Sequence, residues 1–230
     1  MHPDATREYF DTIADQWDEL RRTFFGDGVR QAVIRAANVG SSSVVADVGT
    51  GTGFLAEAAL AAGARVIGID ASEGMLGQVR SRFPSDRFEA RAGDVEALPL
   101  GGSEVDAVLA NMVLHHAEHP PLAIREMARV LKPGGMLVIT DADEHHAEWL
   151  RTEQHDRWLG FKRADIENWF TDAGLLDVTV GDTHELCCPT AECGEKAAIT
   201  IFLARGRKPA LAPVAFAAPR PRYCKGSDKA

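Results

Sequence analysis

The sequence predicts an α/β fold, a doubly wound sheet of seven strands that are mainly parallel, with an antiparallel strand in a C-terminal hairpin. Two observations predict it. Short, continuously apolar segments alternate with segments of helical composition, which is typical of a parallel sheet with helices on both faces. Near the end, two strand-like segments follow each other with only a loop between them, and a hairpin is the simplest connection.

The elements are expected in a regular order. Apolar residues at helical spacing, Ile13 and Trp17 among them, predict helix in the first forty residues. Ser72 is a favourable N-cap, and Pro120 suits a first helical turn. Charge and tryptophan content predict helices over residues 142–170. Strands are predicted at residues 44–49, 65–70, 88–93, 105–110, 136–140, 177–186 and 197–204, and the helices between them at 53–62, 72–83 and 120–131.

Composition predicts three units: an N-terminal helical cap over residues 1–40, one domain over residues 41–205, and a basic, Pro/Ala-rich mobile tail over residues 206–230. The net charge of −9 argues against a nucleic-acid partner, which needs a basic surface. No apolar run is long enough to cross a membrane, and the first residues do not resemble a signal peptide. We therefore expect a cytoplasmic protein without a membrane partner.

A glycine-rich loop carries the clearest functional signal. Residues 47–54, DVGTGTGF, follow a strand and open a helix, where free N–H groups can hold a phosphate or a carboxylate. Asp70 closes the second strand, Asp94 with Val95 closes the third, and Asn111 closes the fourth. Carboxyl ends of parallel strands meet at one edge, which is where open α/β sheets bind ligands.

These segments resemble the successive motifs of class I S-adenosylmethionine-dependent methyltransferases, most closely the small-molecule group. The resemblance rests on residues 47–53, 69–70, 93–95, 98–100 and 131–135, and on an N-terminal helix that covers the cofactor in such enzymes. It implies a Rossmann-like fold, S-adenosylmethionine as cofactor and S-adenosylhomocysteine as product. It also implies cofactor contacts from Tyr9, Trp17, Asp47, Gly49, Thr50, Gly51, Gly53, Asp70, Ala71, Met75, Gly93, Asp94, Val95, Asn111 and Met112.

Histidines follow the ends of the fourth and fifth strands on the same edge. Methyl transfer is an in-line displacement that needs a base only when the acceptor carries a proton. His115, His116 and His145 are the catalytic candidates, with a polar structural role as the alternative. No metal site is predicted, because the contiguous acids and histidines of residues 141–146 point in different directions.

Cys187, Cys188 and Cys193 lie in the loop of the predicted hairpin, on the cofactor edge. Thiolates favour thiophilic ions, so these cysteines could hold arsenic(III) as the methyl acceptor. Arsenite methyltransferases, however, also have cysteines in the N-terminal half, and this chain has none there. The sequence thus predicts methyl transfer to a small molecule. The alternatives are a thiophilic acceptor, a cofactor-binding protein without transferase activity, and an NAD(P)-dependent oxidoreductase.

Overall fold

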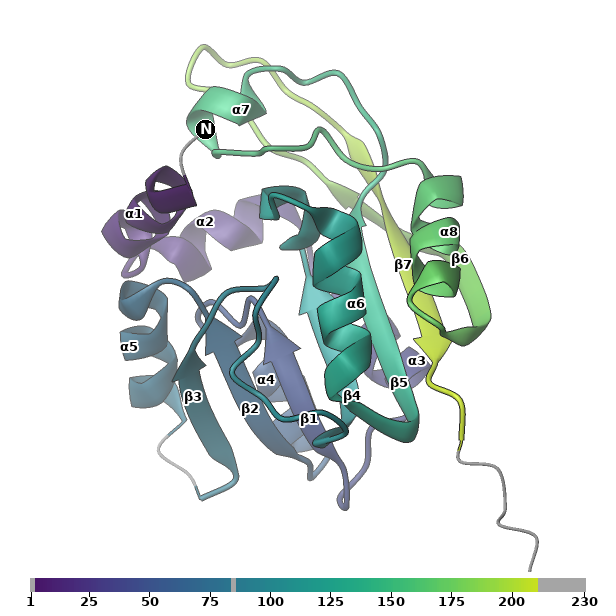
Figure 1. The fold of residues 1–230 in the computed structure, drawn as a ribbon. Coiled ribbons are helices and arrows are strands. Elements are labelled where there is room, and N and C mark those ends of the chain that lie inside the picture. Colours follow the sequence, from purple (N-terminus) through teal and green to yellow (C-terminus); the bar gives the residue numbers. More distant parts are fainter. Residues whose placement is uncertain (1–2, 84–85, 211–230) are drawn as a thin grey trace, which may run out of the picture.

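The computed structural model describes residues 3–83 and 86–210, and it contains a seven-stranded sheet with the strand order β3-β2-β1-β4-β5-β7-β6 (Figure 1). Strands β1 to β5 pair in parallel, whereas β7 runs antiparallel to both β5 and β6. This confirms the predicted fold class and C-terminal hairpin. The strands are β1 Val44–Val48, β2 Arg65–Asp70, β3 Phe88–Ala92, β4 Val105–Asn111, β5 Leu131–Ala142, β6 Leu176–Cys187 and β7 Ile199–Arg207.

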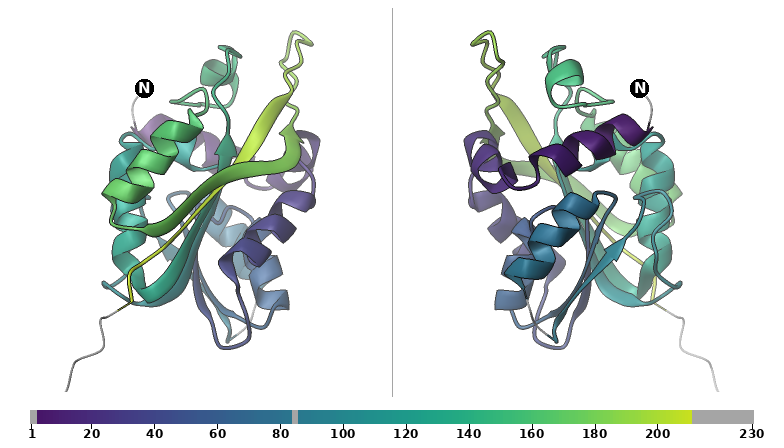
Figure 2. Two further views of the ribbon diagram at one scale, coloured as in Figure 1. Left: turned by 90° about the vertical axis from the view of Figure 1, so that its right-hand side faces the viewer. Right: turned by 90° about the vertical axis from the view of Figure 1, so that its left-hand side faces the viewer.

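Helices cover both faces of the sheet (Figure 2). One apolar core joins α6 and α8 to one face, and a second joins α3 and α4 to the other. Helices α1 and α2 lie across the carboxyl ends of the strands, and α5 flanks β2 and β3 (Figure 1). The helices are α1 Pro3–Ile13, α2 Trp17–Phe24, α3 Gly28–Ala37, α4 Phe54–Ala61, α5 Glu73–Arg82, the 3₁₀ turn η1 Leu114–His116, α6 Pro120–Val130, α7 Leu150–Glu153 and α8 Arg163–Asp172.

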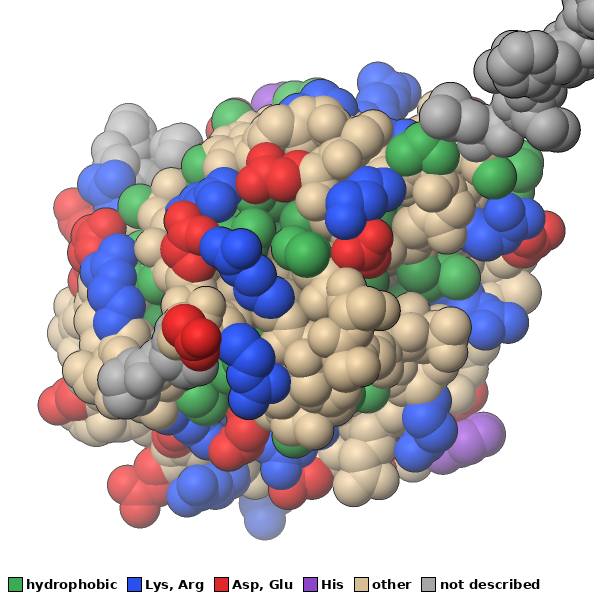
Figure 3. All heavy atoms as spheres, turned by 90° about the horizontal axis from the view of Figure 1, so that it is seen from below, with side chains coloured by type: hydrophobic (Ala, Val, Ile, Leu, Met, Phe, Trp, Pro, Cys, Tyr) green, Lys and Arg blue, Asp and Glu red, His purple; other side chains and the backbone are tan. Residues whose placement is uncertain are grey.

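The strand register aligns the carboxyl ends of the central strands. Val48 in β1 lies beside Ile69 in β2 and Ala110 in β4. The next residues along the three strands are Gly49, Asp70 and Asn111. The residues at these strand ends therefore meet at one edge of the sheet, as expected. The opposite edge of the molecule shows acidic and basic side chains interspersed (Figure 3).

The segment between β5 and β6 differs from its predicted helical structure. Only α7 and α8 are helical there. Residues 142–145 instead pair with residues 159–161 through backbone hydrogen bonds, including His145 N to Leu159 O at 3.0 Å and Phe161 N to Ala142 O at 3.0 Å. Extended pairing satisfies the backbone groups that a helix would have satisfied, and it places this segment over the carboxyl edge of the sheet.

The C-terminal end of the sheet extends past the predicted boundary. Strand β7 continues to Arg207, where Gly206 and Arg207 still pair with β5. Most of the predicted tail, residues 211–230 with Cys224, lies outside the described residues. Among the helices that the structure describes, none has the length and apolar character needed to span a membrane.

Candidate active site

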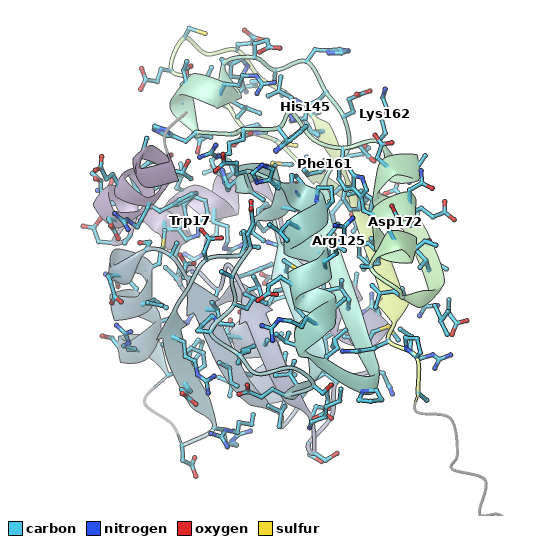
Figure 4. The ribbon with its side chains drawn as sticks, in the orientation of Figure 1. Trp17, Arg125, His145, Phe161, Lys162 and Asp172 are labelled. Atoms are coloured by element: carbon cyan, nitrogen blue, oxygen red, sulfur yellow. The ribbon has the colours of Figure 1, made fainter. Side chains whose placement is uncertain are left out.

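A cavity of about 420 Å³ opens at the carboxyl edge of the sheet, under α1 and α2. Trp17, the first residue of α2, lines the cavity above the strand ends (Figure 4). Nearly all residues that the sequence predicted as cofactor contacts line the cavity. They are Trp17, Asp47, Gly49, Thr50, Gly51, Asp70, Ala71, Met75, Gly93, Asp94, Val95, Asn111 and Met112. The exceptions are Tyr9 and Gly53.

The glycine loop depends on backbone conformations that side chains disfavour. Gly49 has φ +67°, and a Cβ atom there would lie 2.5 Å from Val113 Cγ2. Gly51 has φ +51° and turns its backbone toward the cavity. Thr50 N donates to Ile69 O at 2.9 Å, which ties the loop to β2. Glycines are therefore needed here for the turn and for the close approach of neighbouring chain.

The side chain of Asp47 stabilises this loop through hydrogen bonds. Its Oδ2 accepts hydrogen bonds from Thr50 Oγ1 at 2.8 Å and Ala56 N at 3.0 Å. The side chain is 2% exposed, and burial raises the pKa of its carboxyl to about 7, although both hydrogen bonds favour the charged form. Asp47 thus lines the cavity as expected, but its Oδ2 is occupied by the loop itself.

Asp70 lies at the end of β2 with its carboxylate in the cavity wall. Its two oxygens accept from Gly51 N at 2.8 Å and Ser72 N at 2.9 Å. Each oxygen keeps a further lone pair, so the carboxylate can still accept hydrogen bonds from hydroxyl groups. Burial raises the pKa of Asp70, which these backbone donors oppose. The same residue therefore positions the loop and presents an acceptor to a ligand.

The far end of the cavity is formed after β3. Asp94 is exposed, and one of its oxygens accepts from Glu96 N at 2.7 Å. The Val95 side chain beside it is partly buried against the core. An acceptor next to an apolar surface suits a flat ring that carries an amino group.

The helices above the cavity are fastened at three points. Asp11 Oδ1 accepts from Ser72 Oγ at 2.6 Å and Gly74 N at 2.9 Å, which joins α1 to α5. Asp18 in α2 accepts from Thr52 Oγ1 at 2.5 Å in the glycine loop. Tyr9 Oη donates to Gln154 Oε1 at 2.9 Å. These contacts hold α1 and α2 over the cavity.

Two predicted contacts do not reach the cavity. Tyr9 faces the segment after α7, with its ring 4.7 Å from that of His155, and burial raises its pKa to about 12. Gly53 is the N-cap of α4 with φ +95°, and its missing side chain makes room for Phe83 and Val79. In the structure, Tyr9 joins α1 to the segment after α7, and Gly53 allows Phe83 and Val79 to pack against the loop.

Arg21 also lines the cavity, although the sequence motifs do not predict it there. It is 8% exposed, and its guanidinium lies over the rings of Phe25 and Phe54. Burial lowers its pKa. The available signal was its position one turn after Trp17, on the same face of α2.

A smaller pocket of about 60 Å³ adjoins the cavity, and the two share residues from α1, α2 and the segment after β4. The shared residues are Phe10, Trp17, Phe25, Met112 and His116. Its remaining wall is Phe24, His115, Ala142, His145, Leu150, Gln154, Asp156, Trp158, Gly160, Cys187, Pro189 and Ile199. Aromatic and apolar side chains dominate, with a polar group of histidines and one aspartate.

The polar group centres on His115, one of the predicted catalytic residues. His115 Nδ1 lies 2.7 Å from Asp141 Oδ1, and its Nε2 lies 3.6 Å from Asp156 Oδ1. Burial alone would lower the pKa of His115, but the two carboxylates outweigh it and raise the pKa to about 9. Burial raises the pKa of Asp156 to about 6.

The other two predicted catalytic histidines also line the smaller pocket. His116 Nδ1 lies 3.3 Å from His155 O, and burial together with His115 holds the pKa of His116 well below its usual range. His145 Nδ1 accepts from Ala147 N at 3.3 Å, and burial lowers its pKa too. The structure thus brings the three histidines to one pocket.

The three cysteines of the hairpin loop are not brought together. Cys187 is buried in the wall of the smaller pocket, whereas Cys188 and Cys193 are exposed. Burial raises the pKa of the Cys187 thiol to about 12, which keeps it protonated. Among the described residues, no three-ligand group includes a cysteine. The convergence expected for a thiophilic site is therefore not observed.

The fold and the cavity together define a Rossmann-like domain with a cofactor site at the carboxyl edge of its sheet. Residues 46–139 match the family model described as a methyltransferase domain. The chain is 34% identical over 142 residues to the demethylmenaquinone methyltransferase of Renibacterium salmoninarum, covering 60% of this chain and 59% of the relative. It is 33% identical over 151 residues to the malonyl-[acyl-carrier protein] O-methyltransferase of Erwinia pyrifoliae, covering 66% and 55%.

Solved structures of methyltransferases share this fold. A chain described as a methyltransferase in complex with the Haloferax volcanii Trm112 methyltransferase activator has a TM-score of 0.75 at 21% identity, covering 89% of this chain and 97% of that one. Phosphoethanolamine N-methyltransferase 2 of Haemonchus contortus, in complex with S-adenosylmethionine, has a TM-score of 0.65 at 16% identity, covering 79% and 52%. The chain thus matches a methyltransferase domain over residues 46–139, and these relatives and solved structures are described as methyltransferases, one of them in complex with S-adenosylmethionine. It spans less than two thirds of the length of the curated relatives described above.

Proposed function

We propose that the protein transfers the methyl group of S-adenosylmethionine to a small organic acceptor. One observation carries the proposal: the cavity lined by the methyltransferase motifs adjoins a second, smaller pocket with an aromatic and polar wall. A transferase needs two adjacent sites that bring its reacting atoms to about 3–3.5 Å. The five shared residues form the boundary between the sites, where the transfer would occur.

The cofactor would lie along the sheet edge with each part against a matching group. The Asp70 carboxylate would accept hydrogen bonds from the ribose hydroxyls. Asp94 would accept from the adenine amino group while Val95 packs against the ring. The glycine loop and Arg21 would hold the methionine end, whose carboxylate is the cofactor's anionic group. The sulfonium would then face Asn111 and Met112, next to the smaller pocket.

The acceptor would place its reacting end in the smaller pocket. Aromatic side chains there exclude water, and His145, whose pKa burial lowers, would receive the proton of an O–H or N–H acceptor. The pocket's 60 Å³ admits only the reacting end of a larger acceptor. Relatives named for demethylmenaquinone and for malonyl-[acyl-carrier protein] suggest quinol and carboxylate acceptors as first candidates.

The test measures cofactor binding by calorimetry and then S-adenosylhomocysteine release with a panel of acceptors. The panel contains a demethylated naphthoquinol, malonyl thioesters, phosphoethanolamine, and arsenic(III) with excess glutathione. Release that depends on one of the organic acceptors and is abolished by Asp70→Ala supports the proposal, whereas release with arsenic(III) alone would favour a thiophilic acceptor. Cofactor binding without release for any acceptor would favour a binding protein instead. Binding of a nicotinamide dinucleotide in place of S-adenosylmethionine would contradict the proposal outright.

A further inference from the structure

The polar wall of the smaller pocket contains three groups with the chemistry of metal ligands. His115 and His116 in η1 and Asp156 after α7 each offer one ligand atom, and these atoms all lie within 4.8 Å of one another. His115 and Asp156 are buried, and His116 is partly buried. Segments about forty residues apart supply these ligands, so no local spacing in the sequence predicts the group.

Both imidazoles are held in the orientation that metal-binding histidines have. His115 Nδ1 is paired with Asp141 Oδ1 at 2.7 Å, and Asp141 Oδ2 accepts from Leu114 N at 2.9 Å. His116 Nδ1 faces His155 O at 3.3 Å. An acceptor at Nδ1 assigns a proton to that nitrogen, so Nε2 is the ring nitrogen available to an ion, as carboxylate and carbonyl partners ensure behind metal-bound histidines.

The spacing of the ligand atoms is close to what one ion requires. Two ligand atoms that bind one tetrahedral ion at about 2.0–2.2 Å stand roughly 3.4 Å apart. His115 Nε2 and Asp156 Oδ1 are 3.6 Å apart. Little movement would therefore bring this pair into coordination, and His116 lies within the 4.8 Å group.

We propose that His115, His116 and Asp156 bind one divalent transition-metal ion of the Zn²⁺ type. Two imidazoles and one carboxylate suit such ions, whereas Mg²⁺ and Ca²⁺ take oxygen ligands. Three protein ligands leave a fourth position open, as catalytic zinc sites do. All three ligands line the smaller pocket, so that position is available to an anionic oxygen of the acceptor. This last role rests on the proposed function, whereas ion binding itself does not.

The alternative occupant of the same space is a proton on His115, which would make the group a buried ion pair with Asp141 and Asp156. The test therefore measures ion binding directly. The full chain is stripped with a chelator and titrated with Co²⁺ by visible absorption and with Zn²⁺ by calorimetry. We expect one saturable ion and cobalt d–d bands without a sulfur-to-cobalt charge-transfer band, which sets this site apart from Cys188 and Cys193.

Variants identify the ligands. Asp156→Asn should weaken ion binding by at least ~100-fold, because loss of a partner behind a ligand alone costs about 10–100-fold. Asp141→Asn should weaken it by about 10–100-fold for that reason. The matched control is Glu153→Gln, a carboxylate of the neighbouring turn that does not line the pocket, and it should leave ion affinity unchanged.

Three results would overturn the site: no saturable ion, unchanged affinity in Asp156→Asn, or a sulfur-to-cobalt band that Cys188→Ser abolishes. His116→Gln is the second ligand variant if the melting temperature shows that Asp156→Asn does not fold. Cofactor affinity is measured in the same samples. Asp156 does not line the cofactor cavity, so normal S-adenosylmethionine binding without an ion overturns the metal site alone. Ion binding without cofactor binding overturns the proposed function alone.

Discussion

The guanidinium of Arg21 lies over the ring of Phe54, with Cζ 4.2 Å from the ring centroid, while Arg21 Nε is buried without a hydrogen-bond partner among the described residues. A buried cation is costly unless it is paired, and a cation–π contact of about 2 kcal/mol offsets only part of that cost. Arg21 also lines the cofactor cavity. The guanidinium of Arg21 is therefore positioned to pair with an anionic group of a ligand, and the carboxylate of S-adenosylmethionine is the candidate.

Replacing Arg21 should weaken cofactor binding through this carboxylate. Arg21→Leu should lower S-adenosylmethionine affinity about 10–100-fold, since a hydrogen bond to a charged group contributes about 1.5–3 kcal/mol. Calorimetry with 5′-methylthioadenosine, which lacks the carboxylate, should show no comparable loss. Arg22→Gln, an exposed arginine on the same helix, is the control. Equal losses for both ligands would place Arg21 elsewhere in the site.

The ribose contact of Asp70 can be separated from its role in the loop. Asp70→Asn loses an acceptor for Gly51 N or Ser72 N, so the loop itself is disturbed and affinity should fall at least ~10-fold. The informative comparison is S-adenosylhomocysteine against its 2′-deoxy analogue. The native protein should prefer the ribose form about tenfold, and the variant should lose most of that preference. A variant that keeps the full preference would show that Asp70 does not bind the ribose.

Two glycines, Gly49 directly after β1 and Gly77 inside α5, have opposite expected effects on stability. Gly49→Ala forces a side chain into φ +67° and against Val113, so we expect a loss of about 1–3 kcal/mol in unfolding free energy and loss of cofactor binding. Gly77→Ala in α5 meets no atom within 4 Å, and it should stabilise by about 0.5–1 kcal/mol. Chemical denaturation measures both. A Gly49→Ala protein that matches the native one would remove the argument for a strained loop.

The sequence predicted the parts of the site that each depend on one strand end. Asp70, Asp94 and Asn111 follow apolar strands, and parallel pairing alone brings such residues to one edge. The smaller pocket could not be predicted in this way. His115 meets Asp156 only because residues 142–145 pair with residues 159–161, a contact between segments for which composition favoured helix. Backbone pairing outweighed local propensity there.

The positions of single residues relative to the cavity could not be predicted for a related reason. Tyr9 and Gly53 lie within the recognised motifs, but their roles are decided by the neighbours that the fold supplies, Gln154 for Tyr9 and Phe83 for Gly53. Arg21 was missed because a charged residue on an exposed-looking helix gives no sign of the two aromatic rings that cover it. Contacts across elements are the information that one sequence lacks.

Asp47 should make the stability of the protein depend on pH. Its folded-state pKa of about 7 lies above the ordinary value of 3.8, so the folded state binds this proton more tightly than the unfolded state does. The resulting stabilisation is fully present below about pH 4 and is lost as the pH rises to about 7, a change of up to about 4 kcal/mol.

Asp47→Asn removes this titration with little change in shape, since one amide oxygen can accept from both Thr50 Oγ1 and Ala56 N. Denaturation between pH 4 and 8 should show the variant gaining stability relative to the native protein as the pH rises. Asp165→Asn, an exposed change on α8, should follow the native curve throughout. Parallel curves for Asp47→Asn and the native protein would mean that Asp47 titrates at its ordinary pKa and is charged beneath the loop.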